Sequence, residues 1–177
     1  MWKRYQWPSM PSRPAPDHEA MTQTLCALLT QTWFAADMPE DICERLSAIA
    51  EVKEYPAGAA VVTEGTACRE LGVILHGRVA LRLALPGVGE QTILTIDDGD
   101  LFGWSALLPE SIATSTGVTL VPTTALVFDR EPLASLMASN PEIASAIYPR
   151  VLVAVTRRLQ ATRTQLLDLY RAGHEPW

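Results

Sequence analysis

The amino-acid sequence lacks any apolar run that approaches the roughly 20 residues needed to cross a membrane. It has only three cysteines, Cys26, Cys43 and Cys68, at wide spacing, which excludes a disulfide framework and indicates reduced thiols. The N-terminus carries Lys3 and Arg4 without an apolar segment behind them, so it does not have the pattern of a secretory signal. We therefore predict a cytoplasmic protein that is not associated with a membrane.

Histidine is equally scarce, and its placement argues against a metal site. His18, His76 and His174 are the only histidines, no two of them have the spacing of metal ligands, and the cysteines form no CxxC pair. Ser105 lacks the surroundings of a nucleophile elbow and has no histidine partner that the sequence can assign. Cys68 is interpreted as an inert loop thiol, with redox sensing or haem ligation as the alternative. We expect no catalytic residue, no metal and no cofactor.

Positive charge is also limited. The 177 residues include 14 Lys and Arg against 20 Asp and Glu, which gives a formal net charge of −6 and a pI of about 5.0. Nucleic acids and anionic membranes attract clustered Lys and Arg, so neither is an expected partner. Hydrophobic residues make up 48% of the chain, which is enough for the core of one globular domain.

Composition and periodicity divide the chain into a flexible tail (1–19), a single domain (20–170) and a second tail (172–177). The predicted domain consists of N-terminal helices (20–52), a β-roll (53–130) and C-terminal helices (131–171). The first tail is rich in proline and has no periodicity. Its Trp2 and Trp7 are either chance aromatics or part of a segment that docks on a partner.

Short β-branched runs, cut by glycine about every eight to twelve residues, fill the region 53–130. Val79–Leu85 alternates in part, and Gln91–Ile96 follows as its hairpin partner across "PGVGE". The pattern predicts an antiparallel sandwich or jelly roll, the double-stranded β-helix that cupins also have. The predicted fold class is mainly β with flanking α: an antiparallel β jelly roll, N-terminal helices and a long C-terminal dimerisation helix.

The last predicted helix carries apolar residues at alternating steps of four and three, a heptad seam made by Tyr148, Leu152, Val155, Leu159, Thr162, Leu166 and Leu169. The seam is longer than a small barrel covers, so we predict a homodimer through it; packing on the chain's own barrel is the alternative. Pro149 removes one amide and should kink or restart the helix. Arg157, Arg158 and Arg163 lie off the seam and are predicted to be solvated.

Several glycine-containing segments occur in a recognisable order: Tyr55–Gly58, Glu64-Gly65, Leu71–Leu81, Gly99–Leu108 and Leu126–Glu142. In this order they resemble the cyclic-nucleotide-binding domain of the catabolite-activator and fumarate-nitrate-regulator (Crp/Fnr) superfamily. The resemblance covers roughly residues 30 to 170. It implies a β-roll followed by a short helix and a long one.

The resemblance also implies a ligand loop that reads Phe-Gly-Glu and later Arg-x-Ala, in which the glutamate holds a ribose hydroxyl and the arginine pairs with a cyclic phosphate. Here Trp104 replaces the glutamate, and no Lys or Arg occurs between Arg82 and Arg130. Hydrogen bonds to charged groups contribute about 1.5–3 kcal/mol each, so tight binding of cAMP or cGMP is not expected. The predicted degenerate phosphate-binding cassette consists of Phe102, Gly103, Trp104, Ser105, Ala106, Thr114, Ser115 and Thr116.

Trp104 has two interpretations. It fills the emptied pocket as part of the core, or it forms a stacking wall for an uncharged or aromatic ligand. Asp97, Asp98 and Asp100, which precede it in the sequence, are expected to repel an anion.

Regulators of this family carry a winged helix-turn-helix beyond the long helix, whereas here Tyr170 is followed by "RAGHEPW". Direct DNA binding is therefore not expected. The leading hypothesis is a non-catalytic regulatory or sensor domain that forms a homodimer and responds to an unidentified small molecule, or signals by association. The alternatives are an accessory or structural subunit of a larger assembly, such as a redox enzyme, that binds a protein partner, and a cupin-like enzyme.

Overall fold

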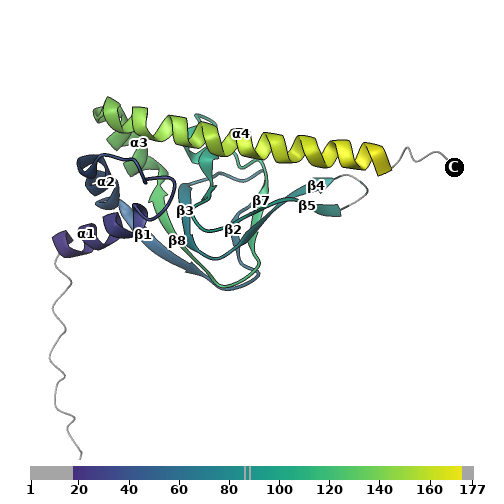
Figure 1. Cartoon of the computed structure of the whole chain (residues 1–177), viewed down its shortest axis with the longest axis horizontal. Coiled ribbons are helices and arrows are strands. Elements are labelled where there is room, and N and C mark those ends of the chain that lie inside the picture. Colours follow the sequence, from purple (N-terminus) through teal and green to yellow (C-terminus); the bar gives the residue numbers. More distant parts are fainter. Residues whose placement is uncertain (1–17, 86, 88, 173–177) are drawn as a thin grey trace, which may run out of the picture.

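The computed structural model describes residues 18–85, 87 and 89–172, and at His18, Leu85 and 165–172 it describes the backbone alone. Helices stand at both ends of the described chain and strands lie between them (Figure 1). The elements are α1 (His18–Leu29), α2 (Glu40–Ser47), β1 (Ala50–Tyr55), β2 (Ala60–Val62), β3 (Glu70–His76), β4 (Val79–Leu85), β5 (Gly89–Ile96), β6 (Leu101–Phe102), η1 (Trp104–Leu107), β7 (Thr116–Thr119), β8 (Thr123–Asp129), α3 (Arg130–Ser139) and α4 (Pro141–Ala172). Of the two predicted tails, residues 1–17 and 173–177 lie outside the described residues.

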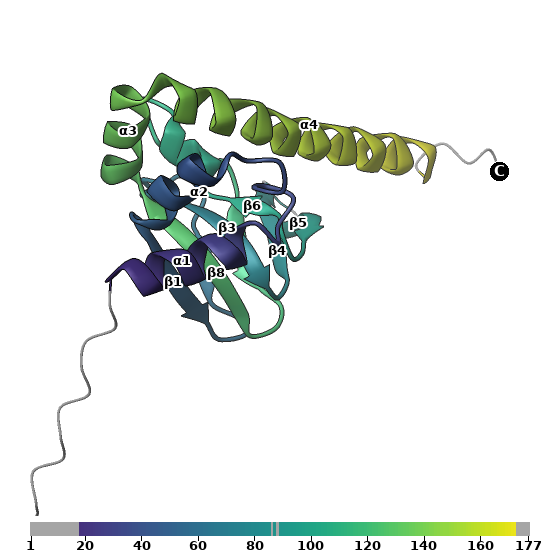
Figure 2. The same ribbon diagram turned by 60° about the vertical axis from the view of Figure 1, so that its left-hand side comes forward.

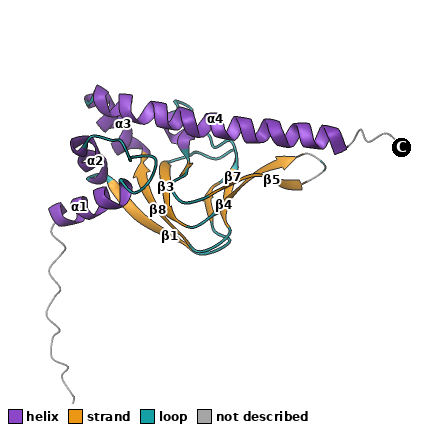
Figure 3. Cartoon of the chain, in the orientation of Figure 1, coloured by secondary structure: helices purple, strands orange, loops and turns teal. Residues whose placement is uncertain are grey.

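The strands form two four-stranded antiparallel sheets (Figure 3). One has the order β1-β8-β3-β6 and the other has the order β2-β7-β4-β5. In the first sheet Ala50 of β1 lies opposite Phe128 of β8, and in the second Val79 of β4 lies opposite Ile96 of β5. Antiparallel sheets, flanking helices and a long C-terminal helix confirm the predicted fold class.

The alternation of side chains along β8 divides the core into two layers. Ala125 and Val127 face the second sheet and pack with Phe102 of β6. Leu126 and Phe128 face the helices. The helix-side layer is completed by large buried side chains from the other elements: Leu29, Phe34, Leu46, Leu71, Leu133, Ile143 and Ile147. The first sheet is therefore covered on both faces, which holds β6 and the loop that follows it in place.

The long helix α4 is one continuous helix of 32 residues that starts at Pro141. It crosses the molecule and extends over the β4–β5 hairpin (Figures 1 and 2). The predicted restart at Pro149 is wrong, because the helix continues through it. Pro149 has no amide hydrogen to donate to the carbonyl of Ser145, one turn earlier. Both residues are exposed, so water can bind that carbonyl instead. None of the described helices is both long enough and apolar enough to cross a membrane.

Candidate functional site

We call residues 103–115, between β6 and β7, the cassette loop, because most of the predicted binding residues lie in it. The loop begins at Gly103, whose φ of 70° is in the left-handed region. A Cβ at this position would lie 2.1 Å from the carbonyl oxygen of Glu70, so only glycine fits. The Cys68 thiol donates to the Gly103 carbonyl over 3.3 Å. The start of the loop is thus fixed against the start of β3.

The far half of the cassette loop is held by Arg130, the first residue of α3. Its guanidinium donates to the hydroxyl oxygen of Ser111 (3.1 Å) and to the carbonyls of Leu108 (3.3 Å) and Pro109 (3.2 Å). The amide of Ala113 donates to the carbonyl of Thr66 over 2.9 Å. Sequence reasoning noted Arg130 only as the end of the cation-free stretch. The available signal was that it is the nearest cation after the loop.

The structure brings part of the predicted cassette together around one small cavity. Gly103, Trp104, Ser105, Thr114 and Ser115 line it. The cavity is completed by residues that were not predicted, from β2, β4, α4 and the loops: Val62, Cys68, Leu81, Ala113 and Arg158. We call this space the cassette cavity.

The other predicted cassette residues have structural surroundings. Phe102 is buried between the sheets, with its ring edge-on to Tyr55 at a centroid distance of 6.3 Å. Ala106 packs in a small cluster with Cys68 and other apolar side chains. The hydroxyl oxygen of Thr116 accepts a hydrogen bond from the backbone amide of Glu64 over 3.1 Å.

The cassette cavity has a volume of about 10 Å³. Pockets for small molecules measure roughly 300–1,000 Å³, and even one water needs about 10–15 Å³. Trp104 is half-buried and packs against the helix-side core layer while it lines this cavity. This arrangement favours the interpretation of Trp104 as a packing residue over that of a stacking wall.

Arg158 of α4 contradicts the prediction that it is solvated. It is half-buried, lines the cassette cavity, and its Nη2 donates to the carbonyl of Leu101. Burial lowers the pKa of its guanidinium to about 10, and the nearby carboxylate of Asp100 opposes that shift. Arg158 lies one helical turn after Ala154 and so shares the face of α4 that packs on the barrel. A search for apolar periodicity does not detect a charged residue on that face.

Arg157 and Arg163 are exposed, as predicted. The guanidinium carbon of Arg157 lies 4.9 Å from the centroid of the Trp33 ring, a cation–π contact that joins α4 to the segment between α1 and α2. The indole nitrogen of Trp33 is buried and has no hydrogen-bond partner among the described residues.

Three residues of the predicted heptad seam are exposed to solvent. Tyr148 is 54% exposed, Leu152 65% and Leu159 60%, while Val155 and Thr162 are half-buried. The side chains of two further seam residues lie outside the described residues: Leu166 and Leu169. The alternative that the seam packs on the chain's own barrel is therefore wrong for Tyr148, Leu152 and Leu159.

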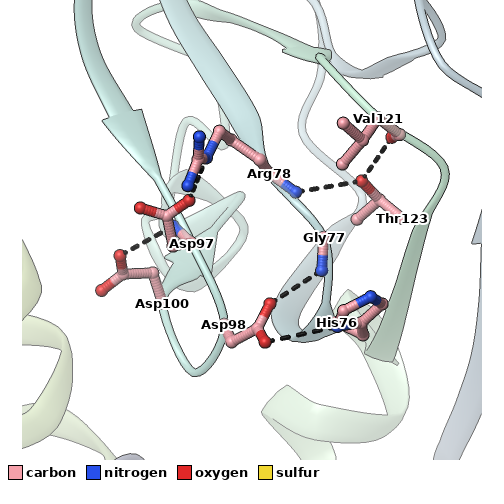
Figure 4. Close-up of polar contacts among 8 residues, drawn as sticks. All are labelled: His76, Gly77, Arg78, Asp97, Asp98, Asp100, Val121 and Thr123. Carbon is pink, nitrogen blue, oxygen red and sulfur yellow. Dashed lines mark hydrogen bonds and ion pairs between the residues drawn. The ribbon is translucent and has the colours of Figure 1, made fainter.

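The acidic residues before the cassette loop form hydrogen bonds within and between neighbouring turns (Figure 4). Asp98 accepts a hydrogen bond from the amide of Gly77 over 2.7 Å, and the Nδ1 of the exposed His76 lies 3.4 Å from its other oxygen. Asp97 accepts from the Nε of Arg78 over 2.5 Å, and Asp100 accepts from the Asp97 amide over 3.1 Å. These carboxylates therefore stabilise the β3–β4 and β5–β6 turns.

The three cysteines are buried and free. Burial raises the pKa of the Cys68 thiol. The pKa of the Cys43 thiol is raised to about 12, first by burial and then by its contact with the Cys26 thiol. High thiol pKa values leave little reactive thiolate, which favours the inert-thiol interpretation of Cys68. Within the described residues, no three His, Cys, Asp or Glu side chains gather in an arrangement that holds a metal.

Comparison with known proteins identifies a transcriptional regulator and a protein kinase among the relatives of this chain. The chain is 29% identical over 116 residues to the "CRP-like cAMP-activated global transcriptional regulator" of Mycobacterium tuberculosis, which covers 66% of this chain and 50% of the relative. It is 27% identical over 115 residues to the cGMP-dependent protein kinase, isozyme 1, of Drosophila melanogaster, over 63% of this chain and 15% of the kinase. The chain thus spans about half the length of the first of these relatives and a smaller share of the kinase.

Solved structures share the fold. A cyclic nucleotide-binding domain from Methylobacillus flagellatus superposes with a TM-score of 0.71 at 22% identity, over 83% of each chain. The catabolite activator protein of Thermus thermophilus gives a TM-score of 0.62 at 23% identity, over 77% of this chain and 62% of that one. The family model described as "Cyclic nucleotide-binding domain" matches residues 52–140, from β1 to the end of α3. The chain therefore belongs to the cyclic nucleotide-binding domain family.

Proposed function

We propose that this chain is a non-catalytic regulatory domain that forms a homodimer through α4 and does not bind cAMP or cGMP tightly in its cassette. Support for the regulatory role comes from the relatives, which are named as a cAMP-activated transcriptional regulator and a cGMP-dependent kinase. The names of these relatives mention cAMP and cGMP, whereas we propose that this chain binds neither tightly. The reason is that its cassette loop has Trp104 and no Lys or Arg side chain.

The observation that carries the proposal is the size of the cassette cavity, about 10 Å³, in a loop without a cationic side chain. A cyclic nucleotide needs room for a base and a ribose and a partner for its phosphate. Trp104 stands where the family pattern has its glutamate, and the arginine of that pattern would fall near Ile112 to Thr114, where no Lys or Arg is present. Backbone amides and hydroxyls remain, but hydrogen bonds without charge assistance are about half as strong.

The outer face of α4, where Tyr148, Leu152 and Leu159 are more than half exposed, supports the homodimer. Apolar side chains that are more than half exposed cost free energy in water, and burying one contributes roughly 1.5–3 kcal/mol. We assign a second copy of this chain as the occupant, because a heptad seam on one helix is complementary to the same seam on another. If the purified chain is monomeric, the homodimer is wrong and a different protein is the expected occupant of this face.

Signalling in such a domain requires contact between the cassette loop and α4. Arg158 provides that contact, since it lines the cassette cavity from α4 and donates to the carbonyl of Leu101, the first residue of β6. A ligand or partner can shift α4 only if it binds two arrangements with unequal affinity.

The test is calorimetric titration of the full chain with cAMP and cGMP, beside the double variant Trp104→Glu/Thr114→Arg. We expect no measurable binding to the wild-type chain at about 100 μM nucleotide and measurable binding to the variant. Thr114 is exposed at the rim, so Thr114→Arg alone serves as a control for the added charge. Micromolar binding by the wild-type chain would overturn the proposal.

A further inference from the structure

A second cavity lies between β5 and α4, and we call it the β5–α4 cavity. Its volume is about 200 Å³, and its polar lining is made by Thr95, Asp100, Arg157 and Arg158. Since one water needs about 10–15 Å³ of such space, the cavity has room for several waters or for one small anion with its hydration. It is distinct from the cassette cavity, with which it shares Arg158.

The charges around the β5–α4 cavity do not balance. Arg157 and Arg158 bring two guanidinium groups, and Asp100 brings one carboxylate. Asp100 already accepts a hydrogen bond from the Asp97 amide over 3.1 Å. Among the described residues, neither arginine has a carboxylate oxygen within 4.0 Å. The cavity therefore carries a net positive charge that the described residues do not neutralise.

Arg158 is the less satisfied of the two groups. A guanidinium has five N–H donors, and the bond to the Leu101 carbonyl is the one hydrogen bond from its side chain that the described residues provide. A charged group that is taken out of water without a charged partner is costly, and the lowered pKa of Arg158 reflects that cost. An anion beside it would offset the cost.

Arg157 is held in position for the same ligand. Its guanidinium lies 4.9 Å above the ring of Trp33 and it also lines the β5–α4 cavity. Stacking restricts the side chain before any ligand arrives, so less rotamer entropy is lost on binding. Trp33 itself is anchored beside the β5–β6 turn, where it contacts Gly99.

We propose that the β5–α4 cavity binds a small phosphate-bearing anion between the guanidinium groups of Arg157 and Arg158. Planar guanidinium donors match phosphate oxygens in pairs, and the several oxygens of a phosphate can accept from both groups at once, whereas a carboxylate has only two oxygens to offer. The ligand is either free phosphate or the phosphate group of a small metabolite. This inference concerns a different cavity from the cassette and does not rest on the proposed function.

The test uses the full chain, with inorganic phosphate, glycerol 3-phosphate and acetate as probes at constant ionic strength. Binding is followed by calorimetry and by the NMR signals of the arginine Nε–H groups. We expect submillimolar binding of a phosphate probe, with shifts of the Arg157 and Arg158 signals, and binding of acetate that is at least about tenfold weaker. Tighter binding of glycerol 3-phosphate than of phosphate would identify a metabolite as the source, and the reverse would identify the free ion.

Matched variants separate this site from general charge effects. Arg158→Met and Arg157→Gln should each weaken phosphate binding by about tenfold or more. Arg150→Gln is the control, because Arg150 is on the same helix and donates to the carbonyl of Ala146 in its own helix. If Arg158→Met does not fold, the exposed Arg157→Gln decides alone. Equal weakening by Arg150→Gln, or no response of the wild-type chain at about 10 mM phosphate, would overturn the proposal.

Discussion

Both faces of α4 are rich in apolar side chains, yet the chain covers only one of them. On the inner face Ile143, Ile147 and Ala154 are buried against the barrel. On the outer face Leu152 and Leu159 are 65% and 60% exposed. The more regular heptad pattern lies on the uncovered face. Apolar periodicity therefore locates the faces of a helix but does not tell which of them packs within the chain.

The two faces also differ in where charge is placed. The inner face includes Arg158, which is half-buried and bonded to Leu101. The outer face is apolar along Tyr148, Leu152 and Leu159. A charge is tolerated on the inner face because the guanidinium of Arg158 donates to the Leu101 carbonyl and part of the side chain remains exposed. Substitutions on the two faces should therefore have different consequences, which can be ordered by size.

The largest effect is expected on the inner face. Ile147→Ala removes a fully buried side chain and should lower the free energy of unfolding by about 2–5 kcal/mol. Val153→Ala, at a 44% exposed position off both faces, should change it by less than about 0.5 kcal/mol. Urea denaturation of both variants measures the difference. Equal losses would mean that the inner face is not the covered one.

The outer face should control assembly. Leu159→Asp introduces an unpaired charge in the seam and should raise the dissociation constant of the dimer by about 100-fold or more. The neighbouring exposed position gives a matched control, Gln160→Asp, which should leave the dimer intact. Sedimentation velocity over a range of concentrations distinguishes them. A Leu159→Asp variant that sediments as the wild-type chain does would remove the assignment of this face.

Arg158 should give a smaller effect, seen as a pH dependence. Burial holds its pKa near 10 in the folded chain, below the ordinary value of an arginine, so above about pH 10 the unfolded chain binds more protons than the folded one. The stability of the wild-type chain relative to Arg158→Met should therefore rise with pH from about 10 upwards and stay constant below about pH 9. Denaturation of the two proteins in parallel cancels the titration of groups that they share. A difference that does not change with pH would contradict the burial of Arg158.

The smallest effect is expected for Arg157. Arg157→Gln removes the cation–π contact with Trp33 and should cost about 0.5–1 kcal/mol. Arg163→Gln, also exposed on α4, should cost nothing measurable. Chemical denaturation followed by circular dichroism reports both changes. If the two variants lose the same stability, the Trp33 contact makes no net contribution.

The fold was predictable because its strongest constraints are local. Turn glycines at regular intervals and the alternation in Val79–Leu85 indicate antiparallel strands without any knowledge of long-range contacts. Gly103 follows a different logic, since the backbone that excludes a side chain there is the carbonyl of Glu70, which is distant in the sequence. In the site, the residues that line the cassette cavity from its own loop were predicted except Ala113, because they are consecutive or nearly so in the sequence.

The remainder of the site depends on contacts between segments that are distant in the chain. Arg130 reaches the cassette loop from α3 and Arg158 reaches it from α4. Neither contact leaves a periodic or compositional signal. Pro149 was overinterpreted for a related reason, since the cost of proline in a helix depends on whether water reaches the carbonyl one turn before it. That is a property of the packed structure.

The length of α4 gives it the properties of a lever. At 1.5 Å per residue, the stretch from Ile147 to the end of the helix at Ala172 is about 37 Å long. A tilt of about 5° at the inner face would move the far end by roughly 3 Å, which is enough to exchange one set of side-chain contacts for another. Small adjustments beside Leu101 and Arg158 would thus be magnified with distance along the helix.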